Sequence, residues 1–532
     1  MFQKRQHIFK FDFCQGKIVR SIFQNAASVS VLTFASRILG VFRDALIAMI
    51  FGTSAQSDAF FVAFRPFDLL RKMFSDGILS ISFVPVFSRY LENKKKDQAI
   101  AMFLSALFLL SVGGVLVVVV GIIFAPVLVK IIAPGFVTGS YAHGLTIILL
   151  KIMLPYLVTI LVIALCMGLL NSLGNFSVPA ATPIVLNLVV ILVAFFFSSY
   201  FDPPVLGLAL GVTLGGIAQL ALQIPFLIRH GMIDLSCFTW LHPGVVRIGK
   251  TMIPCMVGAA SYQINIMVAG FFASQLSQGS VSFLYYADRL VQFPLALFAV
   301  SFSTVFLPSL SRRAALGKRD EVSAIFTKGA MLVFFVTIPA MAGMMALDVP
   351  IVRFLFKQGA FDAAAVRYTA ECLFYLVLGL WAHTGTRLFV TLHFSLSSVR
   401  LPFVAGLISI VLNFCLSWLL MGIMGFKGLA LSVSIASMAG FGVLFIYSAG
   451  TLSRKPLIVS ACRALFLSVI MFFLVRWAAG LILTEESGKW VLGAGLLACI
   501  LLGVVFFLLA GILTASPEIK MIKKILNKEQ SQ

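Results

Sequence analysis

Arginine side chains lie inside the first two strongly apolar segments of this chain, where a bilayer disfavours charge. They are Arg37, Arg43, Arg65 and Arg71. A charge at the membrane centre costs about 2.5–3.5 kcal/mol on insertion scales, so such residues face a protein interior or a wet cavity. A guanidinium binds phosphate oxygens in pairs and keeps its proton. The excess of arginine over acid therefore predicts a transport path for an anionic cargo.

Helical spacing places these charges on shared faces. Residues seven apart on an α-helix differ by about 20° in direction. Arg37 and Asp44 then share one face of the first segment, with Arg43 beside it. The second segment presents a charged stripe of Asp58, Arg65, Lys72 and Asp76. A later apolar segment adds Asp288 and Arg289, near Gln292.

The same residues have a structural alternative, in which buried Arg–Asp pairs only fix helix register. This interpretation suits Arg43–Asp44 and Asp58 best, whereas the full set holds more cations than partners. Arg71, Lys72 and Asp76 lie near one end of their segment, where snorkelling to the interface competes as an explanation.

The elements that position these residues are predicted to be transmembrane helices. The chain has 532 residues, 61% hydrophobic and 11% charged, whereas soluble domains are about 25% charged. A span needs about 20 apolar residues, and the sequence predicts about fourteen of them. They are 28–51, 57–80, 101–124, 145–169, 180–199, 205–228, 251–275, 282–307, 324–347, 368–392, 402–424, 428–449, 458–482 and 489–513. The predicted fold class is an all-α polytopic membrane protein.

The basic residues behind the net charge of +21 are grouped in particular loops between the apolar segments. Basic clusters precede the first segment and follow the second, sixth, eighth, twelfth and fourteenth, so a fourteen-helix arrangement puts all of them on one side. This is the positive-inside pattern with both termini cytoplasmic, and it argues against nucleic acid as the partner. The eight cysteines show no metal-ligand spacing. We expect no cofactor and no enzymatic activity.

An internal duplication divides the chain. Four short words recur in order at an offset of about 220–226 residues: Phe83–Arg89 with Phe306–Arg312, Tyr156–Val158 with Tyr375–Val377, Ile184–Asn187 with Ile410–Asn413, and Gly207–Leu210 with Gly428–Leu431. Six helices per copy predict two parallel lobes, whose interface is where such transporters bind substrate. The predicted parts are a basic N-terminus (1–27), an N-lobe (28–228), a linker (229–250), a C-lobe (251–449), two added helices (450–514) and a basic tail (515–532).

Several motifs closely resemble the MurJ/MviN family of lipid II flippases. They are SRILGVFRD (36–44), DAFFVAFR (58–65), LLRKMFSDG (69–77), FVPVFS (83–88), SVSFLYYADRLVQFP (280–294) and PIVRFLFKQGAFD (350–362). The resemblance extends across the full length. It implies the multidrug/oligosaccharidyl-lipid/polysaccharide exporter superfamily and a bacterial inner-membrane location. It also implies a groove for the lipid tail along the last two helices.

The resemblance implies roles for individual residues. Family cavity arginines match Arg37, Arg43 and Arg289, the acidic residue of the second helix matches Asp58, and Arg71 takes the family's basic position. The chain departs from the family at Pro66-Phe67-Asp68 and at Gln292. Some members bind sodium through helices 7, 11 and 12, where Asn265 and Asn413 are weak candidates. Ser417 replaces an expected carboxylate there, so membrane potential is an equally good driving force.

The sequence thus predicts a flippase that moves lipid II, the undecaprenyl-pyrophosphoryl disaccharide-pentapeptide, to the outer leaflet by alternating access. Cell-wall synthesis proteins are expected partners. The nearest alternative is a flippase for another polyprenyl-pyrophosphate glycan, such as an O-antigen unit. A drug exporter, a purely structural scaffold and a membrane glycosyltransferase using Glu485 and Glu486 are further alternatives.

Overall fold

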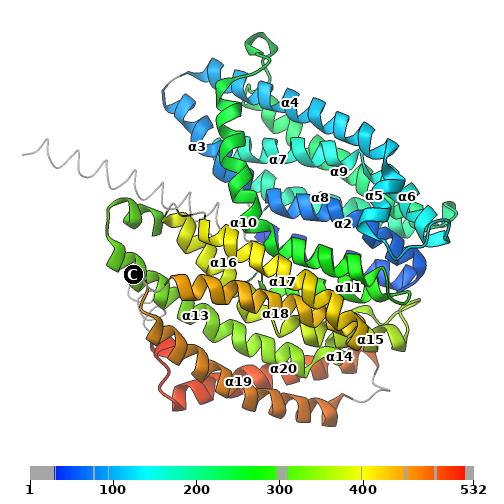
Figure 1. Ribbon diagram of the computed structural model, residues 1–532, viewed down its shortest axis with the longest axis vertical. Coiled ribbons are helices and arrows are strands. Elements are labelled where there is room, and N and C mark those ends of the chain that lie inside the picture. The colour runs from blue at the N-terminus through cyan, green and yellow to red at the C-terminus, as the bar shows by residue number, and fades with distance from the viewer. Residues whose placement is uncertain are drawn as a thin grey trace, which may run out of the picture. The chain divides into compact units, whose positions relative to one another are not determined.

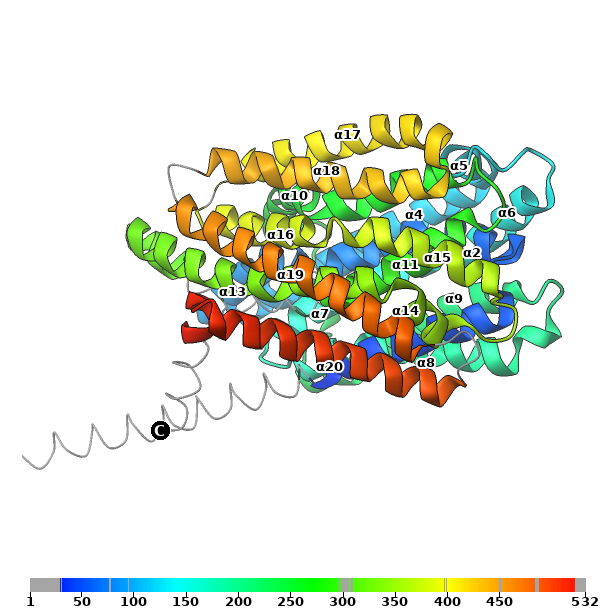
Figure 2. The same cartoon turned by 90° about the horizontal axis from the view of Figure 1, so that it is seen from below.

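The computed structural model describes residues 31–75, 78–93, 95–295, 310–396, 400–448, 452–483 and 488–521, with single positions 29, 297, 306 and 398. Side chains are not described at 74, 75, 78–82 and 250–260. Asp76, Glu485, Glu486, the N-terminus 1–27 and the end of the basic tail lie outside these ranges. Within them the chain is helical with no strand, which confirms the all-α prediction (Figures 1 and 2).

The helices follow one another with short connections. A helix at 31–51 precedes α2 (Ala55–Ser75), α3 (Ile78–Glu92), α4 (Lys96–Ile123), α5 (Ala125–Ile132), α6 (Tyr141–Met153), α7 (Tyr156–Ser172), α8 (Ser177–Phe196), η1 (Ser198–Tyr200), α9 (Val205–Arg229), η2 (Leu235–Cys237) and α10 (Pro243–Ala273). Then come α11 (Ser280–Leu295), α13 (Arg319–Ala346), α14 (Asp348–Phe356), α15 (Ala363–Val377), α16 (Leu380–Ser395), α17 (Arg400–Met424), α18 (Phe426–Tyr447), α19 (Arg454–Ile482) and α20 (Lys489–Leu513).

These helices make the chain a polytopic membrane protein. Among the described residues, nine stretches are long and apolar enough to span a bilayer, and α15 with α16 forms a tenth that is bent by 44°. The helix at 31–51 and α2 do not qualify because they carry the charges discussed above. Each of the roughly fourteen predicted segments overlaps a helix or a bent helix pair, so the predicted span count agrees with the structure.

Two predicted segments are broken helices. The segment predicted at 145–169 is α6 and α7, which meet at Leu154–Pro155, and the one at 368–392 is α15 and α16. The second break has a packing reason. Ser434 of α18 donates its hydroxyl to the carbonyls of Tyr375 (2.6 Å) and Leu376 (3.1 Å), which end α15. A Cβ on Gly379 would collide with Ser434, so glycine permits this approach.

Packing divides the described chain into two compact units. Unit 1 takes the described residues of Met1–Leu46, Pro66–Pro126 and Ile147–Ile253, and unit 2 takes those of Ile47–Arg65, Val127–Thr146 and Pro254–Gln532. The division does not follow the predicted lobes, because α2 changes unit at Pro66 and α10 changes unit at Pro254.

Unit 1 is built around α7, which contacts α3, α4 and α9 (Figure 1). The α8 and α9 helices pair along their lengths. A Cβ on Gly216 of α9 would strike Tyr156 of α7, so this glycine sets the close crossing of the two helices. Phe83, Phe87 and Phe103 are fully buried in the core that α3, α4 and α7 share.

Unit 2 contains a paired α17 and α18, with α18 also packed on α15 and α16. The α13 helix contacts both α16 and α19, and α20 lies along α19 (Figure 2). The segment 47–65 belongs here because the end of the first helix is docked on the turn after α14. Ala360 N donates to Met49 O (2.8 Å), and Gly52 (φ 56°) and Gly359 (φ 55°) let the two backbones meet.

Candidate functional site

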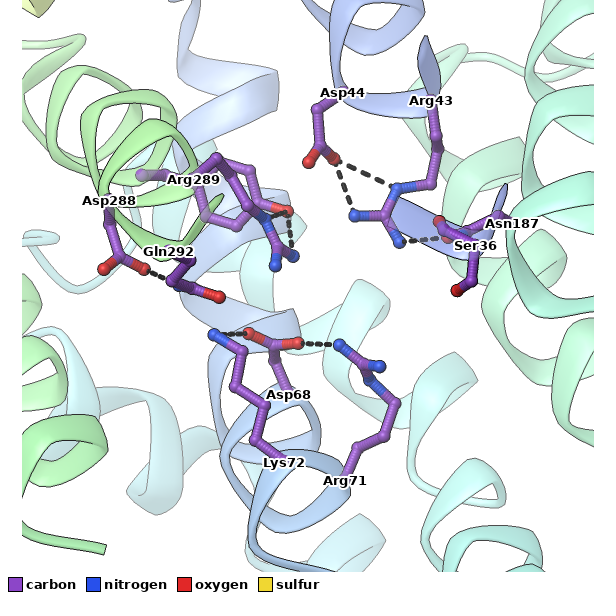
Figure 3. A network of polar contacts seen from close by, with 11 residues as sticks. Ser36, Arg43, Asp44, Asp68, Arg71, Lys72, Asn187, Asp288, Arg289 and Gln292 are labelled. Carbon is purple, nitrogen blue, oxygen red and sulfur yellow. Dashed lines mark hydrogen bonds and ion pairs between the residues drawn. The ribbon is translucent and has the colours of Figure 1, made fainter. Parts of the chain in front are cut away.

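The first cationic group lies in unit 1 and centres on Arg43. Its Nη2 and Nε donate to Asp44 Oδ1 at 2.7 and 3.0 Å, and its Nη1 donates to Asn187 Oδ1 at 3.1 Å. Asn187, on α8, donates through Nδ2 to Ser36 O at 3.0 Å (Figure 3). Arg43 and Asp44 are 5% and 2% exposed. The guanidinium is therefore fixed in direction by two helices.

A second cationic group of unit 1 lies on α2. Asp68 Oδ1 accepts from Arg71 Nη2 at 2.5 Å, while Asp68 Oδ2 pairs with Lys72 Nζ at 2.8 Å (Figure 3). One carboxylate thus orients two cations, because residues three and four apart share a helix face. The Nε of Arg71 is buried and has no hydrogen-bond partner among the described residues. The local excess charge is positive, as an anion site requires.

In unit 2, α11 carries a third cationic group. Arg289 donates to Tyr285 Oη from Nε (3.1 Å) and Nη2 (2.7 Å), and its Cζ lies 4.9 Å from the Tyr285 ring centroid. Asp288 is held differently: Tyr262 of α10 donates to its Oδ1 at 2.5 Å, and Gln292 donates to its Oδ2. Figure 3 labels Asp288, Arg289 and Gln292 on this helix.

Asp58 occupies a position that sequence reasoning assigned to substrate. In the structure its carboxylate accepts from Gly279 N (2.6 Å), Ser282 N (2.9 Å) and Ser282 Oγ (2.6 Å) at the start of α11. It is 3% exposed. An acidic side chain that accepts the unpaired N–H groups of a first helical turn is a helix cap. Asp58 therefore joins α2 to α11, and its substrate role stays a prediction.

The remaining predicted residues are placed as follows. Arg37 is half-buried on the helix at 31–51. Arg65 is half-buried, and its guanidinium lies against Gly270 of α10, where an added Cβ would collide with it. Asp76 lies outside the described residues. The structure thus brings Arg43 together with Asp44, and Arg71 with Lys72, each within unit 1.

The weak cation candidates form a neutral network. Asn265 Nδ2 donates to Ser409 Oγ (2.8 Å), and Asn413 Nδ2 donates to Asn265 O (2.9 Å). The hydroxyls of Ser417 and Ser432 lie 2.7 Å apart, and Ser432 donates to Asn413 Oδ1 (3.0 Å). Amides and hydroxyls without a carboxylate make a weak donor set for a cation. Across the described ranges, no three His, Cys, Asp or Glu side chains gather where they could hold a metal ion.

The two repeats use equivalent asparagines in the same way. Asn187 and Asn413 occupy matching places in the Ile-Val-Leu-Asn word. Each donates its side-chain amide to a backbone carbonyl of the first helix of its own half, Ser36 O in one and Asn265 O in the other. This correspondence supports the duplication predicted from the sequence.

A small cavity of about 30 Å³ lies in unit 2, lined in part by Tyr262, which also bonds Asp288. Tyr262, Asn265 and His383 line it, and the rings of Tyr262 and His383 meet edge-on with centroids 4.4 Å apart. Among the described residues, His383 Nε2 and Asn265 Oδ1 have no hydrogen-bond partner. The space suits about two water molecules, which would satisfy both atoms.

Sequence reasoning did not select Asp68, Asn187, Tyr262 or Tyr285. The spacing of Asp68 to Arg71 and Lys72 was a usable signal, since i,i+3 and i,i+4 pairs meet on a helix. The repeated Ile-Val-Leu-Asn motif singled out Asn187 but did not assign it a role. Nothing local marks Tyr262, because its partner Asp288 lies on another helix.

Comparison with known proteins gives one consistent family. Residues 47–503 match the family model described as "Lipid II flippase MurJ". The chain is 36% identical over 448 residues to a probable lipid II flippase MurJ of Buchnera aphidicola subsp. Acyrthosiphon pisum (strain APS), covering 84% of this chain and 86% of that protein.

Two solved structures have a similar fold. The structure of a lipid II flippase MurJ in an inward closed conformation aligns with a TM-score of 0.77 and 27% identity, covering 91% of this chain and 98% of that one. An inward-facing multidrug resistance MATE family transporter of the MOP superfamily aligns with a TM-score of 0.67 over 79% of this chain and 97% of its own. At 13% identity the second similarity concerns the fold alone.

Proposed function

Since the chain belongs to the lipid II flippase MurJ family, we propose that it moves lipid II from the inner to the outer leaflet of the bacterial cytoplasmic membrane. The substrate joins a polyprenyl tail to a sugar-peptide head through a pyrophosphate. The head is too polar to cross the bilayer unaided, so the protein must supply a path for it. The relatives carry this activity in their names.

The observation that supports the cargo is the set of oriented guanidinium groups. Asp44 and Asn187 hold Arg43, Asp68 holds Arg71, and a tyrosine hydroxyl holds Arg289. A guanidinium fixed in this way loses little freedom when it binds, and its fork matches the oxygens of a phosphate. We propose that Arg37, Arg43, Arg65, Arg71 and Arg289 bind the pyrophosphate in the course of transport.

The proposed mechanism is alternating access between the two repeated halves, with both termini in the cytoplasm. No covalent bond changes, so the protein acts as a transporter and not as an enzyme. We propose that membrane potential drives the cycle, because the Asn265–Asn413 network is neutral; coupling to a monovalent cation is the alternative. The lipid tail lies along α19 and α20, which expose Phe466, Phe473 and Leu501 among many apolar side chains. Cell-wall synthesis proteins are proposed partners.

The test is complementation of cells depleted of their own lipid II flippase, with lipid II in each leaflet measured by leaflet-specific labelling. The intact chain should restore growth and outer-leaflet lipid II, while Arg43→Ala and Arg289→Ala should insert normally and fail. Arg229→Ala, at an exposed arginine that ends α9, is the matched control and should rescue. A well-inserted intact chain that does not restore outer-leaflet lipid II would favour another polyprenyl-pyrophosphate glycan as cargo.

A further inference from the structure

The loop between α9 and α10 exposes large apolar side chains although it lies between two spans. Leu235, Trp240 and Leu241 are 74%, 71% and 61% exposed. The loop is nevertheless well packed, because Met232 is buried and the Phe238 ring lies 5.5 Å from that of Phe108 on α4. The exposed side chains are therefore held outward by a fixed backbone. Large apolar side chains are unfavourable in water, so their exposure indicates that this loop contacts an apolar surface.

This loop runs back along α4. The hydroxyl of Ser105 donates to Trp240 O (3.3 Å) and accepts from His242 N (3.0 Å). The Trp240 ring lies 5.2 Å from the Phe108 ring. Ser105 is about 14 Å along the axis from the start of α4 at 1.5 Å per residue. Trp240 is thus held at a defined depth on unit 1.

The exposure of α4 shows where lipid begins. Lys96 and Asp97 are exposed and charged, residues 99–106 are buried, and the exposed apolar surface starts at Leu109. It continues to Ile123 at the end of α4. From Leu109 to Ile123 is about 21 Å at 1.5 Å per residue, which fits within the roughly 30 Å of a bilayer's hydrocarbon core. Trp240, packed beside Phe108, therefore lies at the edge of that core.

The surroundings of the loop are net positive. Five described cations lie on the elements that flank or contact it, against three acids: Arg89, Lys95, Lys96, Arg229 and Arg247 against Glu92, Asp97 and Asp234. The Ser236 hydroxyl and backbone N–H, both bonded to the Asp234 carboxylate, hold the pKa of that group below its usual range. Lys96 Nζ lies beside Gly231 of the loop. Anionic lipid headgroups are the matching partner for an apolar tip with a basic flank.

We propose that the α9–α10 loop is an interfacial anchor, in which Trp240 and Leu241 insert into the headgroup region of the membrane leaflet beside the start of α4. Tryptophan is enriched at this depth because its ring is apolar and its N–H is polar. The anchor holds the connection between the two repeated halves on one leaflet. It does not depend on which lipid-linked cargo the protein carries.

The test uses the full chain with Trp240 as its only tryptophan, the other four being replaced by phenylalanine, in phosphatidylcholine–phosphatidylglycerol vesicles. Lipids brominated near the headgroup should quench Trp240 emission at least about twofold more than lipids brominated near the chain end. Aqueous iodide should quench it weakly. A chain that keeps only Trp418, 68% exposed on the spanning helix α17, is the positive control for bromine quenching.

Strong quenching by iodide with none by either brominated lipid would place Trp240 in water and overturn the proposal. Equal quenching by shallow and deep bromines would also contradict it, because the ring would then lack a fixed depth. The measurement does not use transport, so its failure leaves the proposed flippase activity unaffected.

Discussion

Replacing Asp58 by alanine should destabilise the junction between α2 and α11. The substitution leaves Gly279 N and Ser282 N without their acceptor in a buried place, and it leaves Ser282 Oγ with only the Ser57 hydroxyl, at 3.1 Å. Hydrogen bonds to charged groups contribute about 1.5–3 kcal/mol each, and bonds that share one carboxylate are not additive, so the expected loss is about 3–5 kcal/mol. Asp58→Asn keeps one acceptor oxygen and turns an N–H₂ toward a donor, so its loss should be about 2–3 kcal/mol.

Thermal unfolding of the purified full chain measures this, with an expected fall on the order of 3–5 °C for Asp58→Ala. A double-mutant cycle with Ser282→Ala isolates the contact, and a coupling energy of about 1–2 kcal/mol is expected. Arg71→Ala offers a contrast, because it should affect lipid II binding more than the stability of α11. If Asp58→Ala melted like the intact chain but lost lipid II binding, the carboxylate would be a substrate ligand and the capping argument would be wrong.

Four further outcomes are expected. Asp68→Ala leaves two cations on one face of α2 without their shared carboxylate and should destabilise unit 1 by about 2–4 kcal/mol, measured by thermal unfolding. Tyr285→Phe removes the hydroxyl that orients Arg289 and should weaken lipid II binding several-fold without changing the melting temperature. Gly359→Ala should cost far more than the roughly 1–2 kcal/mol of Gly139→Ala, because both have positive φ but only the first added Cβ meets backbone, and parallel melting curves test this. Transport of lipid II, measured in each leaflet, should be the same in sodium and potassium buffers. A requirement for sodium would contradict the interpretation that the neutral Asn265–Asn413 network does not couple transport to a cation.

Much of the fold follows from short-range patterns in the sequence. Hydropathy and loop charge predict the spans, because both record how each segment meets lipid or water. The duplication follows from short motifs that recur in order at one offset. Adjacent residues such as Arg43 and Asp44 are also visible as a candidate pair. The breaks at Pro155 and Gly379 are less visible, since a proline or glycine in a span is equally compatible with a continuous helix, as Pro339 inside α13 shows.

Contacts between distant helices were beyond sequence reasoning. Asp58 and Gly279 are 221 residues apart, and Arg43 and Asn187 are 144 apart. Helical periodicity gives the face on which a residue lies but not which helix covers that face. This is why Asp58 was assigned to substrate from its charge and family position, whereas its three partners identify a cap. The substrate roles of the arginines stay predictions for the same reason.

The paired asparagines have an evolutionary consequence. Asn187 and Asn413 descend from one ancestral position, and each still ties its own half together by the same amide-to-carbonyl bond. The spare oxygen of each amide has since acquired a different neighbour, a guanidinium in the first copy and a serine hydroxyl in the second. One inherited crosslink therefore has two electrostatic settings. It is part of a charged group in the first copy and of a neutral network in the second, so the two halves of a duplicated chain divide the charged work unequally.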